Sequence, residues 1–239
     1  MDKSRILYQS EACVVINKAV GESVNSVCAE SVNKNSTMVN VSFELKSLLG
    51  VNFAEAVHRI DVPVTGCTLF ALKPDALSFL NSAFARETSL HNAGKNVVKR
   101  YWAIVEKTNF KLPANGELIH WIETNTRNNK SFAHNEEKKG CKKAVLKYRI
   151  IGEGKNYLFF EIELLSGRHH QIRAQFAAVG LHIKGDLKYG AKRSEKNGGI
   201  RLHARYLSFP NPLEKSSFIS ITADPLEADA LWEAVMGYV

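Results

Sequence analysis

The sequence lacks several features that would assign it to a specialised class of protein. No apolar run approaches the roughly 20 residues needed to span a bilayer, and the N-terminal MDKSRILYQSE has no apolar core of the kind that a signal peptide requires. The only cysteines are Cys13, Cys28, Cys67 and Cys141, whose spacing matches neither a disulfide framework nor a zinc site. Internal repeats and low-complexity linkers are also missing. These absences predict a globular, cytoplasmic protein with reduced, structural cysteines.

Acidic side chains are in the minority, with 24 Asp and Glu against 32 Lys and Arg, for a net charge of +8. The excess is concentrated. From Lys138 to Arg205 there are 16 basic and 5 acidic residues, whereas the rest of the chain has 16 basic and 19 acidic residues. A concentrated basic stretch is the usual footprint of a polyanionic ligand, most often a nucleic acid. A solvated surface that happens to be basic is the alternative, so charge alone favours nucleic acid only modestly.

The apolar patterns predict an α+β fold with many strands and few helices, in one domain, because no linker divides residues 1–239. Strands are expected on either side of the turn QSEA and in the segments CTLFALK, VVKRYWAIVEK, YLFFEIELL, RLHARYLSFPNP and SFISITADP. The polar chain between residues 109 and 143 is interpreted as a surface excursion.

Four helices are expected from apolar spacing and capping residues. Ser42 is predicted to cap FELKSLL before Gly50, and Asp75 to cap ALSFLNSAFARE. The segment SGRHHQIRAQFAAVG is predicted to bury a stripe of Ile172, Phe176 and Val179 and to stop at Gly180. A last helix is expected after Asp224, with Glu227 completing a capping box.

Three segments place polar groups in apolar surroundings. Asp61, in HRIDVPVTG, lies where a loop enters the interior, and a carboxylate there is costly unless something pairs with it or uses it. Tyr101 opens an apolar strand, and Arg173 borders the apolar stripe of its helix, where its guanidinium can hold a carboxylate bidentately. Taken singly, each has an ordinary explanation. For a lone Asp, a turn cap or an ion pair with His58 or Arg59 is the better interpretation.

Taken in order, these segments resemble the RluA family of pseudouridine synthases. HRIDVPVTGCTLFAL resembles the family's catalytic signature, VINKAVGE its N-terminal strand and turn, and VVKRYWAIVE its Lys-x-Tyr strand. ELLSGRHHQIRAQFAAVGLHIKGDLKYG resembles its Gly-Arg-Thr-His-Gln-Ile-Arg segment and Gly-Asp-x-x-Tyr-Gly turn, and RLHARYLSFPNP its closing strand. The resemblance covers residues 5 to about 222 in one order.

The resemblance implies a mixed, mostly antiparallel central sheet with flanking helices and a central cleft. It also implies an enzyme that isomerises specific uridines of tRNA or rRNA to pseudouridine without a metal or cofactor. Asp61 is then the catalytic carboxylate, which adds to the sugar or the base or promotes a glycal route. Arg173 favours its charged form, and Tyr101 stacks on the uracil and relays a proton. The chain is expected to be a monomer that begins directly at the catalytic domain and has no membrane or protein partner.

Substrate binding is assigned by the same resemblance. Arg59 corresponds to a family residue that fills the space left by the flipped base, and the basic stretch is expected to hold phosphates. The residues expected to bind the substrate are His58, Arg59, Arg168, His170, Gln171 and Ile172.

The sequence departs from the family pattern at four positions: Ala19, Val64, His169 and Gln175. These departures bear on substrate choice more than on activity. Two alternatives remain open. One is an RNA-binding or RNA-folding factor that keeps the scaffold with little catalysis. The other is a metal-dependent hydrolase using His58, Asp61 and His169 or His170, which lacks tight ligand spacing.

Overall fold

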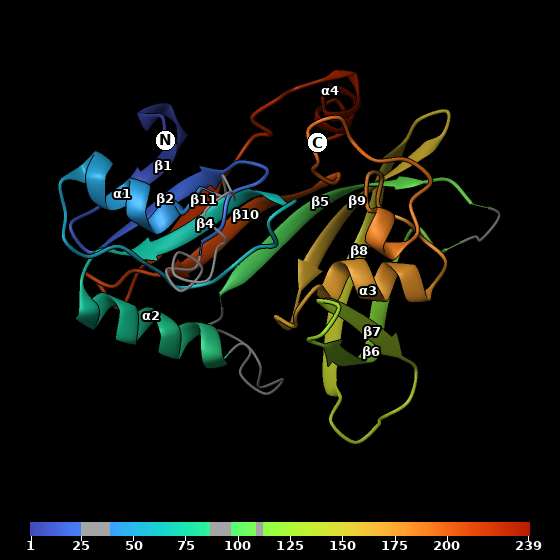
Figure 1. The fold of residues 1–239 in the computed structure, drawn as a ribbon, viewed down its shortest axis with the longest axis horizontal. Helices are drawn as coiled ribbons and strands as arrows, with labels where there is room; N and C mark the ends of the chain where they lie inside the picture. Colours follow the sequence, from blue (N-terminus) through green and yellow to red (C-terminus); the bar gives the residue numbers. More distant parts are fainter. Residues whose placement is uncertain (25–38, 87–96, 109–111) are drawn as a thin grey trace. The chain divides into compact units, whose positions relative to one another are not determined.

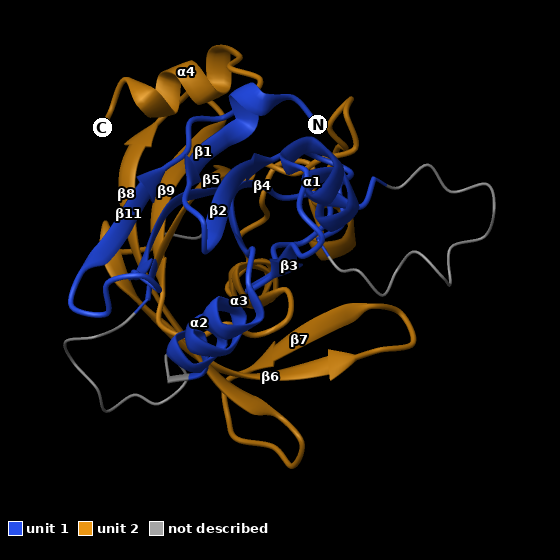
Figure 2. Ribbon diagram, turned by 90° about the vertical axis from the view of Figure 1, so that its left-hand side faces the viewer, with its two compact units in different colours: residues 1–98, 204–226 blue, residues 99–203, 227–239 orange. Residues whose placement is uncertain are grey.

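The computed structural model describes residues 1–24, 39–86, 97–108 and 112–239 (Figure 1). The chain divides into two compact units, coloured separately in Figure 2. Unit 1 comprises Met1–Val98 and Ala204–Leu226, and unit 2 comprises Lys99–His203 and Glu227–Val239. Each unit is a mostly antiparallel sheet with helices packed on it, which confirms the predicted α+β class. The single domain and the central cleft stay predictions.

Unit 1 buries its central strands on both faces. Its strands are, in spatial order, β1 (Ile6–Gln9), β2 (Cys13–Lys18), β4 (Thr65–Ala71) and β10 (Leu202–Pro210), with β11 (Phe218–Thr222) on β10 and β3 (Glu55–Ala56) on β4. Helix α2 (Pro74–Arg86) contributes to the core around Cys13, and α1 (Val41–Leu49) to the core around Val14. Because neighbours in a strand point to opposite faces, the two helices cover opposite faces of β2. This explains the unbroken apolar run of that strand.

The helix starts of unit 1 differ from the predicted ones. Helix α1 is capped by Asn40, whose side chain accepts from the Phe43 N–H, while Ser42 lies inside the helix and donates to the Ala54 carbonyl. Helix α2 starts at Pro74, so that Asp75 lies in its first turn. The predicted stop at Gly50 is confirmed by its left-handed conformation. The polar, weakly patterned sequence of residues 22–40 also predicts a loop, but most of this segment falls outside the described residues.

The described part of unit 2 is a five-stranded sheet with one helix packed on each face. The strands are, in spatial order, β5 (Val98–Glu106), β9 (Tyr157–Leu164), β8 (Lys142–Glu153), β6 (Asn115–Asn125) and β7 (Lys130–His134). Helix α3 (Gln171–Ala178) packs on β6 to β8 through Ala174, and α4 (Ala230–Met236) packs on β5 and β9 through Trp232. The part of the chain that the structure describes also contains two short 3₁₀ helices, η1 (Lys3–Arg5) in unit 1 and η3 (Leu187–Tyr189) in unit 2.

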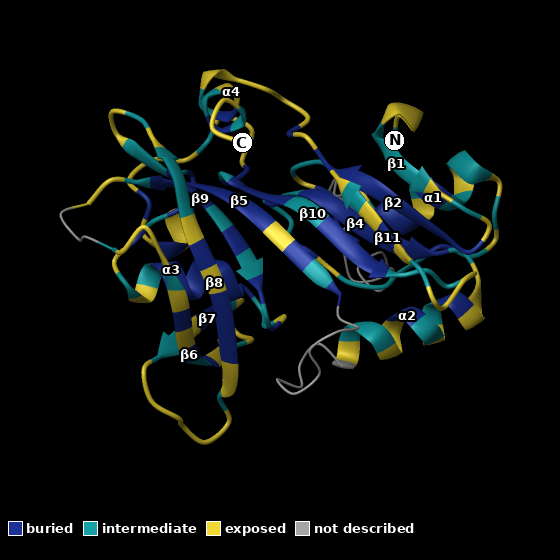
Figure 3. Cartoon of the chain, turned by 180° about the vertical axis from the view of Figure 1, so that it is seen from behind, coloured by how far each residue is buried: buried dark blue, intermediate teal, exposed yellow. Residues whose placement is uncertain are grey.

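The prediction of a surface excursion between residues 109 and 143 is wrong for the parts of that segment that form β6 and β7. Strand β6 alternates strictly, with Leu118, His120 and Ile122 buried and their neighbours largely exposed, and the alternation is visible in Figure 3. A strand with one solvent-exposed face contains about as many polar as apolar residues, so its composition resembles that of a loop. Strand β8 was not predicted either.

The last two helices also differ from the prediction. Helix α4 is capped by Asp229, which accepts from the Leu231 and Trp232 N–H groups, and not by Asp224. Helix α3 buries a wider surface than one stripe, since the polar Gln171, Arg173 and Gln175 are buried with Ile172 and Phe176. Val179 follows the helix and is half-buried. Among the described residues, no helix has the length and apolarity to cross a membrane.

Candidate active site

The HRID segment of unit 1 forms a tight turn that delivers Asp61 to the start of β4. The Val64 N–H donates to the Asp61 carbonyl at 2.9 Å, and the Asp61 side chain is half-buried. Gly66, the second residue after Val64, adopts φ = 112°, and a Cβ at this position would collide with the backbone of Ala204. Only glycine fits here. The Gly of HRIDVPVTG therefore fixes how the chain leaves the aspartate and enters the sheet.

A buried lysine holds this turn from inside unit 1. The fully buried Lys18 ammonium donates to three carbonyls: Ala19 at 2.8 Å, Glu22 at 3.1 Å and Val62 at 3.2 Å. The Gly21 N–H donates to the same Val62 carbonyl at 3.0 Å. The residue directly after Asp61 is thus tied to the turn that follows β2.

Lys18 also affects the charge state around Asp61. Burial lowers the pKa of Lys18 from 10.5 to about 8, and the carboxylates of Glu22 and Asp61 oppose that shift. The Lys18 ammonium and the Asp61 carboxylate therefore interact electrostatically within this turn. Arg5 holds Glu22 through two hydrogen bonds of 2.7 and 2.5 Å. Burial raises the pKa of Glu22, but the Arg5 hydrogen bonds, the Ala19 N–H and the charges of Arg5 and Lys18 together outweigh burial, so that the pKa is lowered.

The structure accounts for one departure from the family pattern. The Ala19 N–H donates to Glu22 Oε2 at 2.8 Å. Proline, which is usual at this position, has no N–H to donate. Ala19 therefore adds a hydrogen bond to the turn that carries the Lys18 contacts.

His58 and Arg59, predicted to bind substrate, have different surroundings. His58 Nε2 accepts from the Leu69 N–H at 3.2 Å, and its ring stacks on Phe84 with 5.2 Å between centroids. These contacts support β4 and α2. Arg59 is exposed. The substrate roles of both residues stay predictions.

In unit 2, Arg173 is held by a partner that the sequence did not indicate. Its Nε donates to Asp186 Oδ2 at 2.7 Å and its Nη2 to Asp186 Oδ1 at 2.8 Å. Only 5% of the Arg173 side chain and 2% of the Asp186 side chain are exposed. The guanidinium carbon also lies 4.8 Å from the ring centre of Tyr189. This bidentate pairing fixes the plane of the guanidinium.

Tyr101 lies on the same face of the unit 2 sheet as α3. It pairs with Ile162, and two positions further along the strands Ala103 pairs with Phe160. Paired residues share a face, and Phe160 contacts Phe176 of α3 edge-on, with 5.2 Å between centroids. The alternate residue Trp102 faces α4 instead. The fold therefore directs the predicted Tyr101 and Arg173 to one side of unit 2.

The turn before α3 is fixed by Gln171. Its Oε1 accepts from Ser166 Oγ at 2.9 Å and from the Arg168 N–H at 3.0 Å, while its Nε2 donates to the Val145 carbonyl at 3.1 Å. The Arg168 side chain is also anchored, through Nε to the Lys143 carbonyl at 3.0 Å. Gln171 and the buried Ile172 thus support the turn, and their predicted contact with substrate stays a prediction.

Two adjacent histidines stack on each other in the same turn. His170 has a left-handed backbone, with φ = 51°, and its Nδ1 lies 2.9 Å from the Tyr189 hydroxyl. The rings of His169 and His170 stack with 3.8 Å between centroids, and His169 Nδ1 lies 2.9 Å from Ser131 Oγ. His169, which departs from the family pattern, therefore links the turn before α3 to β7.

Gln175, another departure, is fully buried under α3. Its Nε2 lies within hydrogen-bond distance of the Leu118 carbonyl, His120 Nδ1 and the Ala144 carbonyl, at 3.0, 3.1 and 3.4 Å. Burial also lowers the pKa of His120, which favours the neutral ring as a hydrogen-bond acceptor. Gln175 is thus a packing residue that joins α3 to β6 and β8.

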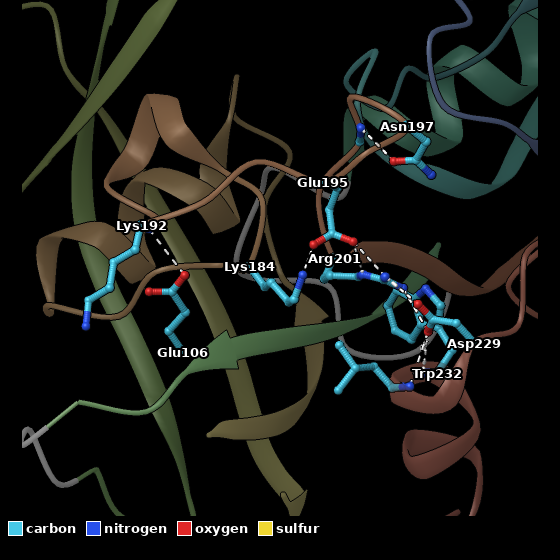
Figure 4. A network of polar contacts seen from close by, with 10 residues as sticks. Glu106, Lys184, Lys192, Glu195, Asn197, Arg201, Asp229 and Trp232 are labelled. Carbon is cyan, nitrogen blue, oxygen red and sulfur yellow. Dashed lines mark hydrogen bonds and ion pairs between the residues drawn. The ribbon is translucent and has the colours of Figure 1, made fainter. Parts of the chain in front are cut away.

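A network of ion pairs supports the turn that carries Asp186 (Figure 4). Glu195 accepts from Lys184 and, through Oε2, from Arg201 Nε at 2.8 Å. Arg201 also donates to Asp229, the cap of α4, at 3.0 and 2.5 Å. Gly185 has φ = 91°, and a Cβ there would collide with the Glu195 side chain. Glu195 therefore packs against the two residues that precede Asp186.

Sequence reasoning missed Lys18, Asp186 and Tyr189 as parts of the site. Each lies in a quoted motif, VINKAVGE or GDLKYG, but none was given a role. The available signal was the cost of burying a charge: Lys18 ends an apolar strand, and Asp186 follows the apolar LHIKG.

The fold is that of the pseudouridine synthases. The solved structure titled "Human RNA Pseudouridylate Synthase Domain Containing 4" matches 98% of this chain and 92% of its own, with a TM-score of 0.70 at 20% identity. The family model described as RNA pseudouridylate synthase matches residues 12–178.

Relatives in sequence agree. An uncharacterised RNA pseudouridine synthase of Zymomonas mobilis is 30% identical over 88% of this chain and 89% of its own length. The ribosomal large subunit pseudouridine synthase D of the same organism is 25% identical over 97% of this chain and 72% of its own length. The chain belongs to the RNA pseudouridylate synthase family, and its reaction is the isomerisation of uridine in RNA to pseudouridine. The reading as an RNA-binding factor with little catalysis is therefore not favoured.

Proposed function

We propose that Asp61 is the catalytic carboxylate and that Arg173 and Tyr101 complete the site. The observation that supports this most directly is that Lys18 fixes the turn that contains Asp61. The Lys18 ammonium donates to the Val62 carbonyl and also interacts electrostatically with the Asp61 carboxylate. A half-buried Asp in a fixed turn beside a cation is suited to attack an electron-poor carbon. Arg173, oriented by Asp186, supplies a second positive charge to favour the ionised form.

Tyr101 is proposed to stack on the uracil and to relay the proton that leaves C5. The reaction breaks the N1–C1′ bond, turns the base and joins C5 to C1′, so it needs a ring surface and a proton acceptor but no change of redox state. A tyrosine offers both. Arg59, which is exposed, is proposed to fill the gap left by the flipped base.

Structured ribosomal RNA is the proposed substrate, and tRNA is the second candidate. The support for ribosomal RNA is that the relative matched over 97% of this chain is named a ribosomal large subunit pseudouridine synthase. Pseudouridine maps of both RNA classes from cells with and without the gene will decide between them. A site that loses its modification in rRNA alone supports the first candidate, and loss in tRNA alone contradicts it. Action as a monomer in the cytoplasm stays part of the proposal.

The Asp61→Asn variant tests the proposal most directly, because it keeps the side-chain shape and removes the charge. Tritium release from 5-tritiated uridine in RNA is expected to vanish, while thermal unfolding and RNA affinity stay near wild type. Asp75→Asn, an exposed carboxylate in the first turn of α2, is the matched control and should retain activity.

Two outcomes would contradict the assignment. Tritium release near the wild-type rate in a folded Asp61→Asn protein would remove Asp61 from the chemistry. A loss of about 3 to 5 kcal/mol in the free energy of unfolding would instead mark Asp61 as a structural ion-pair partner.

A further inference from the structure

Three potential metal ligands of different type, none of them assigned to the isomerisation, converge in unit 2. Glu123 is on β6, His134 ends β7 and Cys141 precedes β8, and one ligand atom from each lies within 4.8 Å of the other two. Cys141 is a half-buried free thiol. His134 Nε2 lies 3.0 Å from Glu123 Oε2. Among the residues that the structure describes, this is the sole grouping of this kind.

The strand register explains the convergence. Trp121 of β6 pairs with His134 of β7, and Glu123, two positions along, points to the same face. On the other side of β6, Ile122 pairs with Lys142, so that Cys141 lies at the position across from Glu123. The turn that leads there is closed by the Cys141 N–H, which donates to the Lys138 carbonyl at 3.0 Å. The three ligands thus come from the adjacent strands β6 and β7 and from the residue that precedes β8.

We propose that Glu123, His134 and Cys141 form a zinc site. Thiolate and imidazole together select zinc over magnesium or calcium, and a carboxylate is a usual third ligand. Three protein ligands leave one tetrahedral position for water. Binding deprotonates the Cys141 thiol, whose proton passes to the solvent, and His134 binds through Nε2 with its own proton on Nδ1.

The charges around the site are mixed. Lys138 Nζ lies 3.1 Å from His134 Nδ1 and opposes both a divalent cation and a proton on Nδ1. Lys138 is exposed, so its side chain can swing into solvent when the metal binds. It therefore weakens the site without blocking it. The metal would fix the loop between β7 and β8 and take no part in the isomerisation, which should be insensitive to EDTA.

Zinc and cobalt titrations of the metal-free protein test the site. We expect saturable binding of one zinc ion, measured by competition with a chromophoric chelator, and a thiolate-to-cobalt charge-transfer band. Cys141→Ser should abolish the band and, like Glu123→Gln, weaken zinc binding by at least about tenfold, since loss of even an outer partner costs that much. Glu117→Gln, an exposed carboxylate on the same strand, should leave the affinity unchanged, and Lys138→Ala should increase it.

Alkylation of the wild-type protein keeps the test independent of how the variants fold. Zinc should slow alkylation of Cys141, measured by peptide mass spectrometry, and EDTA should restore the rate. Binding that is equal in wild type and Cys141→Ser, or an alkylation rate that zinc does not change, would overturn the proposal.

Discussion

At the residue scale, the most consequential side chain is Lys18. It is buried, donates to three carbonyls and adjoins the carboxylate proposed for catalysis. A buried ammonium is costly, and the cost is offset only while hydrogen bonds and nearby carboxylates hold it. Its protonation state therefore links the stability of unit 1 to pH.

The sign of this link follows from the lowered pKa of Lys18, about 8 against 10.5 in an exposed lysine. Between pH 8 and 10.5 the unfolded chain binds more protons than the folded chain, so this residue's contribution to stability rises with pH. The contribution is lost as the pH falls through about 8. We expect the free energy of unfolding of wild type to rise relative to that of Lys18→Met between pH 7.5 and 10, measured with urea.

The control for this prediction is Lys73→Met, in which an exposed lysine is replaced. Its unfolding free energy should follow that of wild type across the same pH range. A constant difference between wild type and Lys18→Met would show that Lys18 titrates as an exposed lysine does.

At this scale, the sequence could indicate only those site residues that lie within short contiguous motifs. Asp61, Tyr101 and Arg173 could be named because each lies in a short contiguous motif. The partner of Arg173 could not, because Asp186 reaches it from 13 residues away through a turn set by Gly185 and Glu195. A pairing of this kind depends on tertiary geometry, which no local pattern records.

At the scale of elements, α4 supports the Asp186 turn indirectly. Its cap, Asp229, and the loop residue Glu195 share the guanidinium of Arg201. Helix α4 thus acts on the loop that leads to η3, although its apolar face packs on β5 and β9.

Glu195→Gln should weaken this support, because it leaves the partly buried Lys184 and Arg201 with less opposing charge. We expect a loss of about 1 to 3 kcal/mol in the free energy of unfolding and a lower kcat, since the turn orients Asp186 and through it Arg173. Urea unfolding and steady-state kinetics measure the two effects. Glu117→Gln is the control. A destabilised variant with unchanged kcat would mean that the network only holds the fold.

Elements were predicted best where burial dictated composition. The strands β2 and β5 have apolar sequences because most of their side chains are buried, and in β9 the buried half of the residues is apolar. The hairpin of β6 and β7 was not predicted, because its solvent-exposed face contains about as many polar residues as a loop would. The caps at Asn40 and Asp229 were missed because several Asp, Asn and Ser residues near each helix start can cap equally well.

At the scale of the whole molecule, the excess positive charge of residues 138–205 falls within unit 2 apart from its last residues. Lys142 and Lys143 are exposed at the start of β8. Neutralising both, as Lys142→Gln with Lys143→Gln, should weaken RNA binding and lower the slope of log affinity against log salt by about 1 to 2, since each phosphate contact contributes about 0.7 to 0.9.

The measurement is RNA affinity over a series of salt concentrations, with thermal unfolding as a check on the fold. Lys73→Gln, outside the basic stretch, should leave both slope and affinity unchanged. A double variant with the wild-type slope would exclude these two lysines from the RNA surface.

The prediction of a single domain is testable through the tryptophans. All three, Trp102, Trp121 and Trp232, lie in unit 2, whereas far-ultraviolet circular dichroism reports on both units. The chain passes from one unit to the other three times, after Val98, His203 and Leu226. We expect the fluorescence and circular dichroism transitions to coincide. A fluorescence transition separate from the circular dichroism transition would show two domains.

The interleaved chain also constrains how the protein is made. The core of unit 1 needs Leu207, Phe209 and Ile219, and the ribosome adds these only after the long segment Lys99–His203. Because synthesis adds about 5 to 20 residues per second, β10 and β11 are completed on the order of 10 seconds after β2 and β4. During synthesis their apolar edges are open to other nascent chains. The N-terminal half of this enzyme is therefore expected to depend on a chaperone at the ribosome more than the C-terminal half does.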